Sequence, residues 1–157
     1  MVKYFRIFIN PYFLLFAAGL FLDQVSKFFA QKFLSFFHAW WVIKPYFSLQ
    51  LVYNYGAAYG ILQNKRFFLL IVSFFVILFA FYFLVKYKNN VIFRLGLIFL
   101  LIGSVGNFVN RLVLGYVIDF MDIKIFPVFN LADVFIDIAI LLLIIDFFGF
   151  SRNKKIL

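Results

Sequence analysis

The segment Phe67–Val85 is almost entirely apolar and contains no charged residue. A helix needs roughly 20 consecutive, mostly apolar residues to cross the hydrocarbon core of a bilayer. Three further segments are mostly apolar over a similar length, although each contains at least one charged residue: about residues 7–29, 91–109 and 128–148. We therefore predict an all-α membrane protein with four transmembrane helices that form a single domain over residues 1–157.

The composition agrees with a lipid environment. Apolar residues make up 67% of the chain, and 28 of its 157 residues are Phe, whereas soluble domains contain about 45–50% apolar residues. The absence of Cys from the sequence excludes disulfides, thiolate zinc sites and a cysteine nucleophile. The single His, His38, cannot form a His-based metal site and disfavours a Ser-His-Asp triad. We interpret it as a polar residue of a boundary segment.

The basic residues predict the orientation in the membrane. The short segments 1–6, 86–94 and 151–157 are rich in Lys and Arg, whereas the longer segments 30–66 and 110–127 hold few for their length. The positive-inside rule then places both termini in the cytoplasm and the two long segments on the outer side. The first apolar segment is longer than the h-region of a signal peptide and is not followed by a cleavage site, so we expect a retained anchor.

The net charge of +9 does not indicate nucleic-acid binding. The basic residues flank the apolar segments and form no patch on a soluble module. Anionic lipid headgroups are the more natural partner of such residues. We therefore expect contacts with membrane lipids and none with nucleic acid.

The first outer segment contains more than a plain loop. Trp40 and Trp41 suit the membrane interface. Tyr46–Tyr53 is rich in residues that favour strands, and Gly56 and Gly60 follow it as turn residues. We predict a small sheet on the outer membrane surface.

Polar residues gather at the outer ends of the predicted helices. An ionisable group at membrane depth is costly, so each one is a functional candidate. Once the orientation is set, four separate segments place polar residues at one depth on the outer side: Asp23, Lys27, Asn107, Asn110, Arg111, Asp119, Asn130 and Asp133.

Simpler structural roles remain open for several of these residues. Asp23 and Lys27 have the spacing of an i,i+4 ion pair. Asn130 suits the N-cap of the last helix, and Asp133 suits its first turn, where an acidic group interacts well with the helix dipole. Asp119 is also compatible with an ordinary loop carboxylate.

Three other aspartates lie outside this group. We expect Asp122 to be solvated or interfacial and Asp146 to pair with Arg152 or its neighbours. Asp137 lies one turn deeper than Asp133 on the same helix face, and the sequence assigns it no role.

The available side chains limit a hydrolase to two main designs, a Ser/Lys pair or two aspartates. Ser26 and Lys27 are adjacent, so on a helix they point about 100° apart, which is poor geometry for a nucleophile and its base. Two close carboxylates instead raise one pKa, so that one is protonated while the other is ionised and activates water. Asp119 and Asp133 are candidates because a short segment joins them, in which Pro127 can turn the chain back toward the membrane.

At these residues the chain resembles the lipoprotein signal peptidases, the signal peptidase II family, over nearly its whole length. Five blocks in the correct order carry the resemblance: Asp23–Lys27 (DQVSK), Asn54–Gly60 (NYGAAYG), Gly106–Arg111 (GNFVNR), Val117–Phe120 (VIDF) and Phe129–Asp133 (FNLAD).

The resemblance implies a monomeric, multi-pass enzyme of the bacterial cytoplasmic (inner) membrane with a small extracytoplasmic β-cradle. It implies an aspartyl endopeptidase that removes the signal peptide from diacylglyceryl-modified prolipoproteins by cleavage before the lipidated Cys. The catalytic pair would be Asp119 and Asp133, with no metal and no cofactor. Residues that bind substrate or support the pair would be Asp23, Lys27, Asn54, Gly56, Asn107, Asn110, Arg111 and Asn130.

Two departures from the family pattern leave alternatives open. The family usually has Asp where this chain has Asn110, and the segment between Asp119 and Asp133 looks shorter than usual. A homologue that binds precursors without cutting them is one alternative. A non-catalytic four-helix transporter or assembly factor is another, for which Asp137 and Asp146 offer only thin support as charges along a path through the bilayer.

Overall fold

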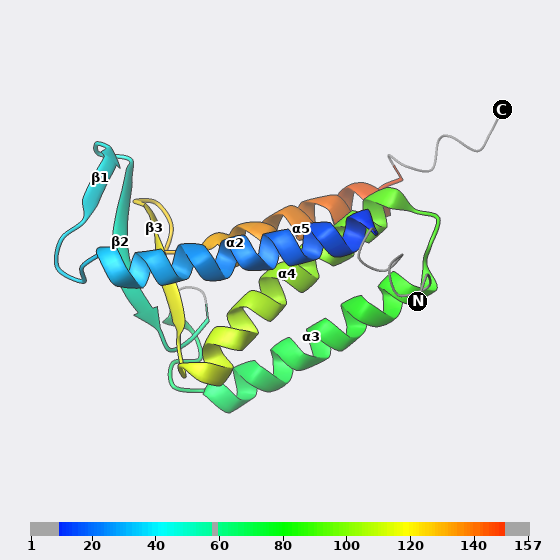
Figure 1. The fold of residues 1–157 in the computed structure, drawn as a ribbon, viewed down its shortest axis with the longest axis horizontal. Helices are drawn as coiled ribbons and strands as arrows, with labels where there is room; N and C mark the ends of the chain where they lie inside the picture. The colour runs from blue at the N-terminus through cyan, green and yellow to red at the C-terminus, as the bar shows by residue number, and fades with distance from the viewer. Residues whose placement is uncertain (1–9, 58–59, 150–157) are drawn as a thin grey trace, which may run out of the picture.

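The computed structural model describes residues 10–57 and 60–149, which form a helical bundle with a small sheet at one end (Figure 1). The helices are α2 (Pro11–Phe33), α3 (Arg66–Lys86), α4 (Val91–Val113) and α5 (Leu131–Phe147). The strands are β1 (Trp40–Ile43), β2 (Phe47–Asn54) and β3 (Val117–Ile123).

Three of these helices, α2, α3 and α4, are long and apolar enough to cross a membrane. The fourth, α5, has 17 residues and is shorter. Large apolar side chains cover the outside of the bundle, and the Phe67 side chain, for example, is 79% exposed. Such a surface is suited to lipid rather than to water.

Asparagine side chains fix the starts of three helices. Asn10 caps α2 by accepting a hydrogen bond from the backbone of Tyr12, and Pro11 follows at the first helical position, where no N–H is needed. Asn90 caps α4 in the same way. Asn130 caps α5, and Asp133 completes a capping box with it.

Helix α4 is the centre of the bundle and packs against α2, α3 and α5 (Figure 1). Two glycines allow its close approach to neighbouring helices. A Cβ atom on Gly103 would lie 2.3 Å from the carbonyl oxygen of Ala132, and one on Gly106 would lie 2.4 Å from a carboxylate oxygen of Asp23. The sequence at these positions therefore brings α5 and the polar part of α2 against α4.

The three strands form an antiparallel sheet in the order β1-β2-β3. The sheet lies at the end of the bundle where α2 ends and α5 begins (Figure 1). Leu51 of β2 and Ile118 of β3 are buried with Ala30 of α2 in a small apolar core. In the register of β2 and β3, Val52 pairs with Asp119, so Asp119 lies in the sheet at this end of the bundle.

The structure corrects several predicted boundaries. Within the described residues α2 begins at Pro11 and continues to Phe33, while a start at Ile7 lies outside the described residues. Helix α4 extends to Val113, and α5 begins at Leu131 because Asn130 caps it.

The predicted sheet is present and larger than expected. The sequence indicated strand structure for Tyr46–Tyr53, which corresponds closely to β2. Trp40 and Trp41, which were assigned only to the membrane interface, also begin β1, and β3 was not predicted.

Candidate active site

Asp119 is buried at the centre of the polar residues, with 2% of its surface exposed. Each of its carboxylate oxygens accepts one hydrogen bond. Asn130 donates to Oδ1 at 2.6 Å, and Asn54 donates to Oδ2 at 2.9 Å. Asp119 is therefore part of a buried strand, and the alternative of an ordinary loop carboxylate is wrong.

Asp133 is held in the same manner from the first turn of α5. Asn107 of α4 donates to its Oδ1 at 2.8 Å, and the backbone N–H of Asn130 donates to its Oδ2 at 3.1 Å. Asn130 thus contacts both carboxylates, Asp119 through its side chain and Asp133 through its backbone. Its role as N-cap and its position in the site are two consequences of one geometry.

Burial raises the pKa of Asp119 from 3.8 to about 6, and the charge of Asp133 acts in the same direction. Hydrogen bonds from Asn130 and Asn54 and the charge of Lys27 lower the pKa and oppose this shift. A carboxyl group with such a pKa can hold a proton close to neutral pH, which is the property required of one member of a two-aspartate pair.

A buried ion pair between Lys27 and Asp23 lies next to the two candidate carboxylates and is connected to them by hydrogen bonds. Lys27 donates to Asp23 at 3.0 Å and to the side-chain oxygen of Asn107 at 2.9 Å, and both charged residues are at most 1% exposed. Asn107 connects the ion pair to Asp133, because its side-chain oxygen accepts from Lys27 while its amide nitrogen donates to Asp133. The ion pair expected from the i,i+4 spacing is therefore present and is connected to the candidate carboxylates.

Asp23 also fixes the position of α5. Its Oδ1 accepts a hydrogen bond of 2.9 Å from the backbone N–H of Ala132. Such N–H groups in the first turn of a helix have no partner within the helix, and a negative charge there is favourable. Asp23 thereby ties α2 to the first turn of α5, which carries Asp133.

Arg111 and Asn110 hold the loops around the carboxylates. Arg111 donates to the backbone oxygen of Gly56 at 3.0 Å. Asn110 accepts a hydrogen bond from the backbone N–H of Ile118 at 3.4 Å and donates to Gln24 at 3.3 Å. Asn110 therefore faces the start of β3 and contacts neither Asp119 nor Asp133.

The structure corrects the expectation for Asp122. It is 7% exposed, rather than solvated, because Ser48 of the neighbouring strand donates to it at 3.2 Å and Lys124 forms an ion pair with it. Asp146 accepts a hydrogen bond of 2.5 Å from Asn90, while its expected partner Arg152 lies outside the described residues.

Sequence reasoning gave no structural role to Gln24 or Arg66. Gln24 donates to Asp23 at 2.8 Å and to the backbone of Gly106 at 3.2 Å, so it joins α2 to α4. Arg66 donates to the backbone oxygens of Arg111 and Leu112 at 2.8 Å and satisfies the end of α4. The available signals for the role of Gln24 were its position next to Asp23 and its place in the block Asp23–Lys27.

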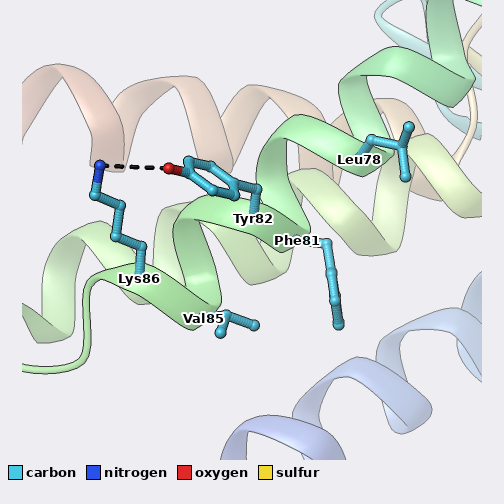
Figure 2. A pocket seen from close by; sticks show the side chains of 5 residues that line it. All are labelled: Leu78, Phe81, Tyr82, Val85 and Lys86. Carbon is cyan, nitrogen blue, oxygen red and sulfur yellow. Dashed lines mark hydrogen bonds between the residues drawn. The ribbon is translucent and has the colours of Figure 1, made fainter.

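A separate hollow lies on the outward side of α3 and is unrelated to these residues. It is lined by Leu78, Phe81, Tyr82, Val85 and Lys86, with a hydrogen bond of 3.4 Å between Lys86 and Tyr82 (Figure 2). Its lining contains no carboxylate. It therefore lacks the groups for the two-aspartate chemistry.

The model of the signal peptidase II family, Peptidase_A8, matches residues 15–149. The chain belongs to the signal peptidase II family. All five sequence blocks that carry the resemblance fall within the matched residues. Members of this family are aspartic peptidases, in agreement with a site built around two aspartates.

Relatives and solved structures agree over most of the chain. The lipoprotein signal peptidase of Caldanaerobacter subterraneus subsp. tengcongensis is 42% identical over 78% of this chain and 86% of the relative. That of Brevibacillus brevis is 36% identical over 92% of this chain and 99% of the relative. A bacterial membrane enzyme solved by the in meso method at 2.3 Å resolution superposes with a TM-score of 0.88, at 30% identity over 96% and 95% of the two chains.

Proposed function

We propose that the chain is a bacterial membrane peptidase that removes signal peptides from prolipoproteins, with Asp119 and Asp133 as its catalytic pair. The signal peptidase II family and the names of its relatives support the activity. One observation supports the assignment of the pair: both carboxylates have one donor on each oxygen, and Asn130 contacts both of them.

The pair hydrolyses the peptide bond before the lipidated Cys without a covalent intermediate. Asp119 carries the shared proton, because burial raises its pKa, and donates a hydrogen bond to the scissile carbonyl. Asp133 takes a proton from a water molecule whose oxygen attacks the carbonyl carbon. The C–N bond of the resulting intermediate then breaks, the Cys amine receives a proton, and the pair returns to its singly protonated form.

The surrounding amides keep the two carboxylates in place. Asn54 and Asn130 position Asp119, and Asn107 positions Asp133 with the support of Lys27. Asp23 anchors α5 through Ala132. Arg111 and Asn110 hold the Gly56 loop and the start of β3, where they help to form the surface that receives the substrate.

In this proposal the whole chain is one domain with four transmembrane helices. Helix α5 is about 26 Å long at 1.5 Å per residue. Its 17 residues are at the lower end of the range of lengths that can cross a bilayer. Both termini face the cytoplasm, and residues 30–66 and 110–127 lie outside, where the sheet contacts membrane lipids. The enzyme acts as a monomer.

Incubation of the purified protein with a diacylglyceryl-modified prolipoprotein tests the proposal. We expect the wild type to release the signal peptide, seen as a shift on a gel, and both Asp119→Asn and Asp133→Asn to leave the precursor intact. Asp146→Asn provides a matched control at the other end of the bundle. Cleavage by either site variant would refute the catalytic assignment.

A further inference from the structure

One side of α5 faces away from the other helices. It runs from Asp133, in the first turn, toward the C-terminal end of the helix. Because successive residues turn by about 100°, Asp133 shares one face of the helix with Asp137, Ile140, Leu141 and Ile144. We call these five residues the α5 face. Its three apolar members are exposed, Ile140 by 48%, Leu141 by 58% and Ile144 by 48%.

The opposite side of α5 is closed. Ala132 and Ala139 are fully buried, and the α4 glycines Gly103 and Gly96 lie close to their carbonyl oxygens. Of the two candidate catalytic residues, Asp119 is 2% exposed whereas Asp133 is only partly buried. A substrate must therefore approach the pair from the side of Asp133, which is also the side of the α5 face.

Asp137 is exposed on this face and has no hydrogen bond or ion pair within the described part of the chain. It lies four residues after Asp133, so it is about 6 Å deeper along the helix. A carboxylate at membrane depth without a partner is costly. A donor group on a molecule bound to the α5 face would reduce this cost.

We propose that the α5 face binds the apolar segment of the signal peptide that precedes the scissile bond, and that Asp137 favours substrates with a hydrogen-bond donor at its depth. The inference rests on the proposed function, because that function requires the scissile bond to lie at Asp119 and Asp133. The residues before this bond enter the membrane and need an apolar surface that continues inward from the pair. The α5 face provides that surface.

The exposed side of α3 is equally apolar and offers a matched comparison. Phe79, at 55% exposure, lies as deep below the outer end of its helix as Ile144 does on α5, because each is 13 residues after the first residue of its helix. However, α3 contributes no residue to the hydrogen bonds around Asp119 and Asp133. An experiment can therefore distinguish a helix surface that only contacts lipid, as expected for α3, from one that binds the signal peptide, as proposed for the α5 face.

Photocrosslinking tests the docking surface without turnover. A photoreactive amino acid replaces Ile144 or, as control, Phe79, in a full-length Asp119→Asn variant mixed with lipidated prolipoprotein. We expect a strong adduct from position 144, mapped to the apolar part of the signal peptide, and only background from position 79. Equal adducts from both positions would overturn the proposal. Parallel cleavage by the wild type tests the proposed function separately.

A substrate series tests Asp137. In a series of prolipoprotein substrates, each apolar residue before the scissile bond is replaced by Gln, one at a time. The cleavage rate of each substrate is divided by the rate of the unchanged substrate with the same enzyme. At one position we expect this ratio to be about tenfold lower for Asp137→Leu than for the wild type, as for loss of a hydrogen bond to a charged group. Indistinguishable ratios at every position would overturn the role of Asp137.

Discussion

Asn130 donates a hydrogen bond of 2.6 Å from its side chain to a carboxylate oxygen of Asp119. The same residue caps α5 and donates its backbone N–H to Asp133 at 3.1 Å. One residue thus caps the helix and contacts both carboxylates. This arrangement explains why Asp119 and Asp133 should behave as one functional unit, and it leads to the first prediction.

The double variant Asp119→Asn/Asp133→Asn should be scarcely less active than either single variant. Two residues that share one proton act together, so removing the first already removes the function of the second. Single-turnover cleavage of lipidated prolipoprotein by the three variants measures this. Losses that multiply in the double variant would show that the two carboxylates act independently.

The pH dependence should follow the proton on Asp119. Its pKa of about 6 predicts that kcat/KM declines as the pH rises through this value, because the proton donated to the scissile carbonyl is lost. Asn54 donates to the ionised carboxylate and lowers the pKa, so Asn54→Ala should move the descending limb to higher pH. A pH–rate profile of both enzymes measures the shift.

Asn89→Ala is the matched control for this experiment, because Asn89 is an exposed residue between α3 and α4. Its descending limb should coincide with that of the wild type. A limb that stays in place in Asn54→Ala, or moves to lower pH, would contradict the assignment of the proton to Asp119.

Close packing of α4 on α5 should make Gly103 intolerant of a side chain. A Cβ atom there would lie 2.3 Å from the backbone oxygen of Ala132, and overpacking of this kind costs about 1–3 kcal/mol. In Gly96→Ala the nearest atoms, at 2.9 and 3.0 Å, belong to the Leu143 side chain, which can move. Thermal unfolding in detergent should show a clearly larger loss for Gly103→Ala than for Gly96→Ala.

Much of this architecture could be predicted because its signals are local. The uncharged run at Phe67–Val85 is helix α3 almost residue for residue, and the candidate carboxylates stood out because charge is rare in such a chain. Contacts between distant residues gave no such signal. Asp122 was expected to be solvated or interfacial, because its partner Ser48 is 74 positions away. The hydrogen bond from Ala132 to Asp23 spans 109 positions.

The missed strands have a related cause. Trp40 and Trp41 are fully compatible with a membrane interface, and their pairing with Ser48 and Leu49 of β2 becomes evident only in the folded sheet. Val117–Ile123 was interpreted only through its aspartates Asp119 and Asp122 and through the block Val117–Phe120. The role of Asn110 also required the structure, which shows that its oxygen accepts from the backbone of Ile118, a bond that either Asn or Asp can form.

The orientation remains a prediction that fusions can test. The excess of basic residues in segments 86–94 and 151–157 predicts that reporters fused after Lys88 and after Leu157 both lie in the cytoplasm. A reporter fused after Lys65, in an outer segment, serves as the opposite control. An outer signal from either of the first two fusions would contradict the four-helix topology.

The enzyme should require the diacylglyceryl group of its substrate. In the proposed orientation the candidate pair lies at the outer ends of apolar helices, so a peptide without lipid must leave water and lose conformational freedom before it reaches that depth. Each buried CH₂ of an acyl chain contributes about 0.8 kcal/mol to membrane partitioning, and two chains therefore hold the Cys firmly at the interface. The scissile bond next to that Cys then lies at the level of Asp119 and Asp133, and its effective concentration rises.

Cleavage of one prolipoprotein with and without the diacylglyceryl group, at equal concentration in the same bilayer, measures this requirement. We expect the unmodified form to be cleaved slowly or not at all, even when it is inserted in the membrane. The control variant Asp122→Asn removes a carboxylate outside the catalytic pair, and it should keep the same preference for the lipidated form. Equal rates for the two substrates would contradict the requirement, because they would show that the apolar signal peptide alone brings the scissile bond to Asp119 and Asp133.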